Sequence, residues 1–267
     1  MNTDSDELTP RIIRKPSYLD DFVTGDEIDQ LQNLAMFSTS DDPVTYDEAV
    51  KYDMWTKAKD QEIQGIEKND TWELVTLSEG AKKIGVKWIY KTKYNEKGEI
   101  EKYKARLVAK CYSQQHGIDY NEIFAPVARW DSIRTILAIA ASQNWPVHQL
   151  NVISAFLHEK LTENVYVEQP KGYQKVGDKV YKLKKALYGL KQAPRAWYSK
   201  IESYFGQDNF NKCPHEHTLF VKQDGSKILI VSLYVDDLIY TGNNIDKFES
   251  FKNSMKKKFA MTDLGQM

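Results

Sequence analysis

The stretch that decides the fold reads ILIVSLYVDDLIY and spans residues 228–240. Two apolar runs flank a pair of adjacent acidic residues, Asp236 and Asp237. The pattern predicts two strands joined by a tight turn at Asp236-Asp237, because apolar runs on both sides of a short polar segment are typical of a hairpin. In such a turn the two carboxylates project at the edge of a sheet, where they could bind a hard cation. An ordinary Asp-rich turn without chemistry is the alternative, and this stretch alone does not decide between the two.

On both sides of this stretch the hydrophobic pattern predicts more strands and helices. One face of the first predicted helix carries residues at three- and four-residue steps: Ala49, Tyr52, Trp55, Ala58, Glu62 and Ile66. Because strands and helices follow one another irregularly, the order favours the α+β class over a doubly wound sheet. Helical spacing covers residues 45–69, 131–145 (with a cap at Asp131), 194–205 and 245–259. Strand patterns cover residues 85–91, 103–109, 147–152, 164–168, 179–183, 218–222, 227–235 and 238–240, with hairpin turns at 95–98 and 224–225.

Composition excludes several classes of protein. The chain has 267 residues, a formal net charge of −1, 41% hydrophobic residues and two cysteines. No apolar run reaches the roughly 20 residues that cross a bilayer, and two cysteines are too few for a disulfide framework. Membrane-spanning, collagen-like and disulfide-stabilised classes are therefore excluded. Residues 1–43 are acidic and lack a hydrophobic period, which predicts an acidic flexible linker or tail before a folded part at 44–267.

The small net charge hides an uneven distribution. Residues 1–50 carry 12 acidic and 3 basic side chains, so the rest of the chain carries a net charge of +8. Basic residues gather at 82–110 and 171–200, with tyrosines and tryptophans among them. Lysines neutralise phosphates and aromatic rings stack on bases, so these stretches favour a nucleic-acid partner. Two well-solvated surfaces are the alternative.

Several blocks of sequence, in order, resemble the reverse transcriptase of copia-type retrotransposons over about residues 43–267. The sequence YVDD at 234–237 resembles the catalytic box of reverse transcriptases. The other blocks include GVKW at 85–88, KYKARLVAK at 102–110, FAPVAR at 124–129, SAFLH at 154–158, VYVEQP at 165–170 and LYGLKQAPRAWY at 187–198.

The resemblance implies a right-hand polymerase with fingers and palm, the palm being an antiparallel sheet with helices packed on it. It implies an RNA-directed DNA polymerase that binds an RNA or DNA template with a primer, takes a dNTP and uses two Mg²⁺ ions. The implied metal ligands are Asp236, Asp237 and the backbone carbonyl of Val152. The resemblance also implies work in cytoplasmic virus-like particles beside the other parts of a Pol polyprotein, with no membrane partner.

The resemblance further implies a nucleotide-binding set. Arg106, or Lys104 if the register of the hairpin differs, would contact the triphosphate from a fingers hairpin. Phe156 matches the aromatic residue that crowds a ribose 2′-hydroxyl. The turn at Gly189 and Lys191 matches one that packs near the incoming nucleotide. Core packing of Phe156 and a solvated position for Arg106 are the alternatives.

Three positions depart from the family's pattern. Asn151 stands where the family has the aspartate of a Leu-Asp-Val motif, a carboxylate that faces the Asp236 hairpin. Cys111 and Glu159 stand at family glycines. The chain is also expected to end before the thumb and the ribonuclease H domain. We therefore expect this copy to be inactive. The alternative is a non-catalytic retrotransposon remnant that at most binds nucleic acid.

Two other interpretations have less support in the sequence. Cys213, His215 and His217 are ligand types for zinc, but no second pair of ligands accompanies them. A two-metal nuclease or phosphatase would use the paired carboxylates, but nothing else in the chain resembles such a site.

The polymerase interpretation makes a direct structural prediction. Strands 147–152 and 228–240 lie side by side, which brings Asn151 within a few ångströms of Asp236. Helix 194–205 packs beneath these strands.

Overall fold

The computed structural model describes residues 42–95, 97–175 and 177–267. Nearly all of the predicted acidic tail, residues 1–43, lies outside these ranges. The described chain is a mixture of helices and largely antiparallel sheets, which confirms the α+β class. Among the described helices, none combines the length and the apolar character that a bilayer crossing requires.

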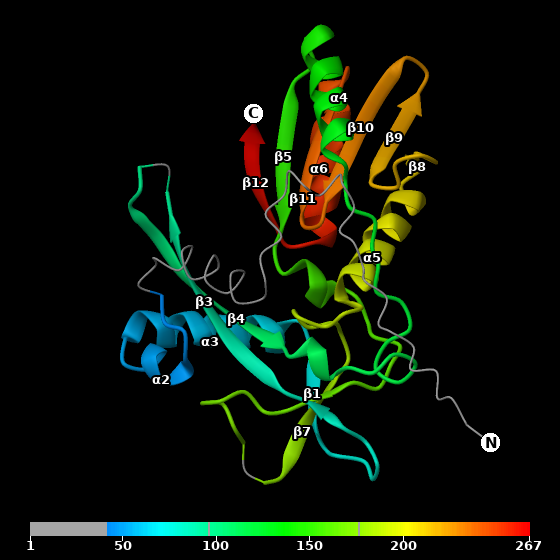
Figure 1. Cartoon of the computed structure of the whole chain (residues 1–267). Helices are drawn as coiled ribbons and strands as arrows, with labels where there is room; N and C mark the ends of the chain where they lie inside the picture. Colours follow the sequence, from blue (N-terminus) through cyan, green and yellow to red (C-terminus); the bar gives the residue numbers. More distant parts are fainter. Residues whose placement is uncertain (1–41, 96, 176) are drawn as a thin grey trace, which may run out of the picture. The chain divides into compact units, whose positions relative to one another are not determined.

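A six-stranded antiparallel sheet organises the C-terminal half (Figure 1). Its strand order is β12-β5-β11-β10-β9-β8. The strands are β5 (Val147–Val152), β8 (Asn211–Lys212), β9 (Leu219–Asp224), β10 (Lys227–Tyr234), β11 (Asp237–Gly242) and β12 (Met261–Gln266). The decisive stretch therefore supplies the two central strands, β10 and β11, and the predicted strand 147–152 pairs directly with β11.

Three helices accompany this sheet. Helix α4 (Trp130–Ser142) contacts β11, while α5 (Ala193–Gln207) and α6 (Ile245–Lys258) share one buried core with β5, β10 and β11. The large residues of that core include Trp197, Ile201 and Phe205 from α5 and Phe248, Phe251 and Met255 from α6. The expected packing of helix 194–205 beneath the paired strands is confirmed.

The N-terminal half packs around a second core. A long hairpin joins β3 (Val86–Tyr94) to β4 (Ile100–Ala109), and α3 (Asp53–Lys68) packs against β4. A four-stranded sheet of order β1-β7-β6-β2 completes it. Its strands are β1 (Trp72–Thr76), β2 (Lys83–Ile84), β6 (Tyr166–Val167) and β7 (Lys179–Leu183). Phe156 packs against both cores.

Several predicted boundaries are wrong. The helix predicted at 45–69 is two helices, because Thr45 and Glu48 form a capping box that starts a short α2 (Tyr46–Ala49) and α3 begins only at Asp53. Asp131 is not a cap, since α4 already begins at Trp130. Segment 164–168 contributes only Tyr166–Val167 as strand.

The turn of the decisive hairpin also differs from the prediction. Tyr234 pairs with Asp237, so the turn consists of Val235 and Asp236, and Asp237 is the first residue of β11. Val235 adopts a left-handed backbone with φ 56°, which is costly for a β-branched residue. A hydrogen bond from Trp197 to the Val235 carbonyl holds the turn in this conformation.

Candidate functional site

The turn between β10 and β11 is held from two sides. The indole Nε1 of Trp197, in α5, donates a hydrogen bond to the Val235 carbonyl oxygen at 2.6 Å. The backbone N–H of Val152, at the end of β5, donates to the Asp236 carbonyl oxygen at 2.7 Å. These two bonds offset the strain at Val235 and fix where the Asp236 side chain emerges.

Asn151 lies beside this turn, as the sequence predicts. The register of β5 and β11 pairs Asn151 with Asp237. The amide Nδ2 of Asn151 donates to Asp237 Oδ1 at 2.9 Å, and the amide of Gln149 approaches the same oxygen at 3.4 Å. Asp237 is thus engaged by two neutral amides, and Asp236 lines the adjacent pocket.

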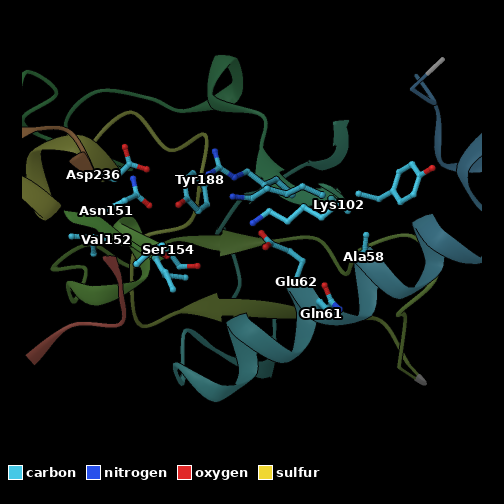
Figure 2. A pocket seen from close by; sticks show the side chains of 15 residues that line it. Ala58, Gln61, Glu62, Lys102, Asn151, Val152, Ser154, Tyr188 and Asp236 are labelled. Atoms are coloured by element: carbon cyan, nitrogen blue, oxygen red, sulfur yellow. The ribbon is translucent and has the colours of Figure 1, made fainter. Parts of the chain in front are cut away.

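That pocket has a volume of about 320 Å³ and lies between the two cores (Figure 2). Asp236, Asn151, Val152 and Ser154 line one end. Helix α3 and strand β4 line the other. Figure 2 shows Asn151 beside Asp236 and, from the opposite side, Glu62 directed into the pocket.

Three cations from β4 form what we call the basic wall: Lys102, Lys104 and Arg106. They lie on one face because side chains alternate along a strand. The Arg106 guanidinium stacks over the Tyr188 ring, 4.4 Å from its centroid. Burial, reinforced by the nearby Arg106 charge, lowers the pKa of Lys104. Burial also raises the pKa of Tyr188 to about 12.

Glu62 faces the basic wall from α3. Its carboxylate Oε1 accepts a hydrogen bond from the Leu107 backbone N–H at 3.2 Å. Burial raises the pKa of the Glu62 carboxyl, and the Leu107 hydrogen bond and the charges of Arg106 and Lys104 oppose that rise. The sequence patterns above assign Glu62 no function. The available signal was a carboxylate on the apolar face of a helix, four residues from both Ala58 and Ile66.

The other predicted nucleotide-binding residues lie outside the lining of this pocket. Phe156 packs against Tyr188 with ring centroids 4.9 Å apart. Gly189 has φ +89°, and a Cβ there would approach the Ala109 carbonyl oxygen to 2.3 Å, so the turn requires glycine. Lys191 donates its backbone N–H to Gln114 Oε1 at 2.9 Å and its Nζ to the Tyr120 hydroxyl at 3.2 Å.

The two positions that differ from family glycines fit ordinary backbone. Cys111 begins a short 3₁₀ helix and is absent from the described residues with positive φ. Glu159 has φ −110° and pairs with Lys200 at 3.1 Å. In the loop considered for zinc, Glu216 accepts hydrogen bonds from the Ser132 and Thr218 hydroxyls. That loop is therefore organised around a carboxylate with protein partners.

The acidic end of the pocket does not match two Mg²⁺ ions. Two-metal sites place the ions about 3.5–4 Å apart, so nearby carboxylates have to offset their repulsion. Here Asp236 is the carboxylate at this end, Asp237 is bonded by amides, and Asn151 is neutral. Within the described ranges no cluster of three or more His, Cys, Asp or Glu residues is arranged to hold a metal ion. The residues present therefore do not fit the two-ion site that the resemblance implies.

Comparison with known proteins identifies relatives over most of the chain. The family model described as reverse transcriptase (RNA-dependent DNA polymerase) matches residues 69–267. The retrovirus-related Pol polyprotein from transposon TNT 1-94 of Nicotiana tabacum is 42% identical over 212 residues, which cover 78% of this chain and 16% of that polyprotein. The Pol polyprotein from transposon RE1 of Arabidopsis thaliana is 41% identical over 225 residues, 83% of this chain and 15% of that polyprotein.

The chain thus spans about one sixth of the length of these relatives. Among solved structures, the foamy viral protease-reverse transcriptase in complex with double-stranded DNA matches with a TM-score of 0.36 and 9% sequence identity. That match covers 78% of this chain and 30% of the viral chain.

Proposed function

Because the chain belongs to the reverse transcriptase (RNA-dependent DNA polymerase) family, we propose that its pocket is the nucleotidyl-transfer site of a copia-type retrotransposon polymerase, disabled in this copy by Asn151. The relatives, Pol polyproteins of plant transposons, confirm the resemblance seen in the sequence. The domain would act as one part of such a polyprotein, within cytoplasmic particles.

We assign the two halves of residues 44–267 to palm and fingers. The six-stranded sheet with α4, α5 and α6 is the palm, and the β3–β4 hairpin with α3 belongs to the fingers. The pocket between them supports this assignment, because it brings Asp236 from one half opposite the basic wall from the other. Residues 1–43 would be the linker that precedes the domain.

The basic wall would hold the triphosphate of a dNTP. Arg106 offers a planar set of donors that matches phosphate oxygens, and stacking on Tyr188 orients it. Lys102 and Lys104 add positive charge beside it. A primer on an RNA or DNA template would approach the Asp236 end of the pocket. In the family Mg²⁺ supplies the charge neutralisation at this point, and in this chain the donors for it are incomplete.

The observation that carries the proposal is the hydrogen bond from Asn151 to Asp237. An aspartate at residue 151 would add a negative charge beside Asp236 and Asp237. The amide instead satisfies Asp237 without adding charge, so the site retains its shape but loses affinity for dications. The chain should therefore bind nucleotide and primer–template but not extend the primer.

Binding tests this function without requiring catalysis. We expect fluorescent dTTP and a fluorescent primer–template to bind the full chain, with an affinity that falls as salt rises. Arg106→Ala should weaken dTTP binding at least tenfold and reduce the salt slope. Arg134→Ala is the matched control, because Arg134 lies on α4 with its side chain 76% exposed. Equal losses in the two variants would contradict the assignment of the basic wall.

A further inference from the structure

Glu62 is the charged residue in the lining of the pocket to which the proposed function gives no role. It projects from α3 toward the face of β4 that carries the basic wall (Figure 2). One carboxylate oxygen is occupied by the Leu107 N–H, which fixes the side chain in place. Among the described residues Glu62 forms no ion pair with Lys102, Lys104 or Arg106 within 4.0 Å. The cations therefore remain open to an external anion, with a carboxylate held close to them.

The charged surroundings of Glu62 are mixed. From β4, the three cations of the basic wall face the pocket, while the ring of Tyr103 packs on Trp55. Tyr188 adds a phenol, and Asp236 lines the pocket from the β10–β11 turn. From α3 itself the neighbours Ala58 and Gln61 are uncharged. The cations favour the ionised form of Glu62 as long as no other anion neutralises them.

An incoming phosphate chain reverses this balance. Its negative charges neutralise the basic wall and stand next to the Glu62 carboxylate, which then experiences like-charge repulsion. A protonated Glu62 would remove the repulsion, keep its carbonyl oxygen on the Leu107 N–H and donate its own O–H to a phosphate oxygen.

We propose that Glu62 takes up one proton from solvent when a phosphate chain binds to the basic wall, so that Glu62 makes nucleotide loading depend on pH. The inference rests on the proposed function, since it requires that the triphosphate bind here. Burial already raises the pKa of the Glu62 carboxyl in the free chain, so protonation of Glu62 costs less free energy. Binding of a phosphate chain should raise this pKa further, because the bound proton and the bound phosphate chain each increase the affinity for the other.

The test uses inorganic tripolyphosphate as the probe, with EDTA present and the full chain. At each pH the dissociation constant of wild type is divided by that of Glu62→Gln. The titration of tripolyphosphate itself affects both constants equally and therefore cancels in this ratio. The amide of the Glu62→Gln variant keeps an acceptor for the Leu107 N–H, so the contact that holds the side chain is preserved. We expect a ratio near one at pH 5 and at least ten at pH 8. Glu67→Gln, an exposed position on the same helix, should give a ratio of one at both.

Arg106→Ala separates the two ways of failing. If Arg106→Ala weakens tripolyphosphate binding but the Glu62→Gln ratio stays near one at every pH, the role of Glu62 is wrong and the proposed function stands. If Arg106→Ala leaves binding unchanged, the phosphate site lies elsewhere and both fall. Should Glu62→Gln not fold by circular dichroism, Glu62→Met removes the same charge with a side chain of similar length and is held to the same ratios.

Discussion

Replacing Asn151 by aspartate turns an amide–carboxylate contact into one between two carboxylates. Asn151 Nδ2 lies 2.9 Å from Asp237 Oδ1. A hydrogen bond to a charged group contributes about 1.5–3 kcal/mol. Two like charges 4 Å apart repel by about 1 kcal/mol in bulk water and about 4 kcal/mol at an effective dielectric constant of 20. Because both side chains are only part-buried and can move apart, we expect Asn151→Asp to lower the free energy of unfolding by about 2–4 kcal/mol at pH 7 in EDTA.

Thermal unfolding measures this loss. For a domain of this size about 1 kcal/mol shifts Tm by roughly 2–4 °C, so the variant should melt about 4–16 °C below wild type. Repulsion raises the folded-state pKa of one carboxyl above its unfolded value of about 3.9. The loss of stability in Asn151→Asp is therefore absent below the unfolded-state pKa and develops as pH rises through the folded-state pKa. Mg²⁺ at about ten times its Kd should restore about 1.4 kcal/mol to the variant.

The control adds the same charge elsewhere. Asn253 is exposed on α6. Asn253→Asp should leave Tm within about 2 °C of wild type, with or without Mg²⁺. Surface substitutions typically change stability by less than about 0.5 kcal/mol. An Asn151→Asp variant as stable as wild type in EDTA and unaffected by Mg²⁺ would refute the reasoning, because it would mean that residue 151 does not share a site with the acidic pair.

Three further predictions concern the framework of the pocket. Gly189→Ala should destabilise the chain by at least about 2 kcal/mol, because its Cβ would meet the Ala109 carbonyl oxygen. Gly206→Ala should stabilise the chain by up to about 1 kcal/mol, because a Cβ at this position in α5 meets open space. Urea unfolding measures both changes. Trp197→Phe should cost about 2 kcal/mol in the same assay by leaving the Val235 carbonyl unbonded. Burial raises the folded-state pKa of Glu62, so its stabilising contribution is full below its unfolded pKa of about 4.3 and is lost as pH rises through the folded value. Glu62→Gln should accordingly match wild type in Tm at about pH 4 and exceed it at about pH 7.5, and a difference independent of pH would contradict the burial of the charge.

Strands with strong apolar patterns are predictable from the sequence. Val147–Val152 and Lys179–Leu183 have the predicted bounds because their alternating or apolar residues bury one or both faces. Strand β12 has no such pattern. Met261–Gln266 is mostly exposed and is a strand because it pairs with the edge of β5. Its formation depends on a tertiary partner, which local sequence does not encode.

Within the site, the sequence predicts which residues meet but not how they bond. The resemblance brings Asn151 to the acidic pair, and the β5–β11 register confirms that proximity. A valine at positive φ is disfavoured by local sterics, so the turn at Val235 was not predictable without Trp197, which is 38 residues away in the sequence. Glu62 was missed for the same reason: its contact with β4 joins residues 45 positions apart.

The central claim is that Asn151 disables a reverse transcriptase site, and primer extension tests it most directly. Wild type and Asn151→Asp, each with a thumb segment from a relative joined after Met267, would be compared on an RNA template with a DNA primer, dNTPs and Mg²⁺. Asn253→Asp in the same form is the control. Each 1.36 kcal/mol of lost transition-state stabilisation slows a step about tenfold, and a missing carboxylate beside Asp236 should cost several times that. We expect extension by Asn151→Asp and none by wild type or the control. Equal extension by wild type would contradict it, and so would the absence of extension from all three.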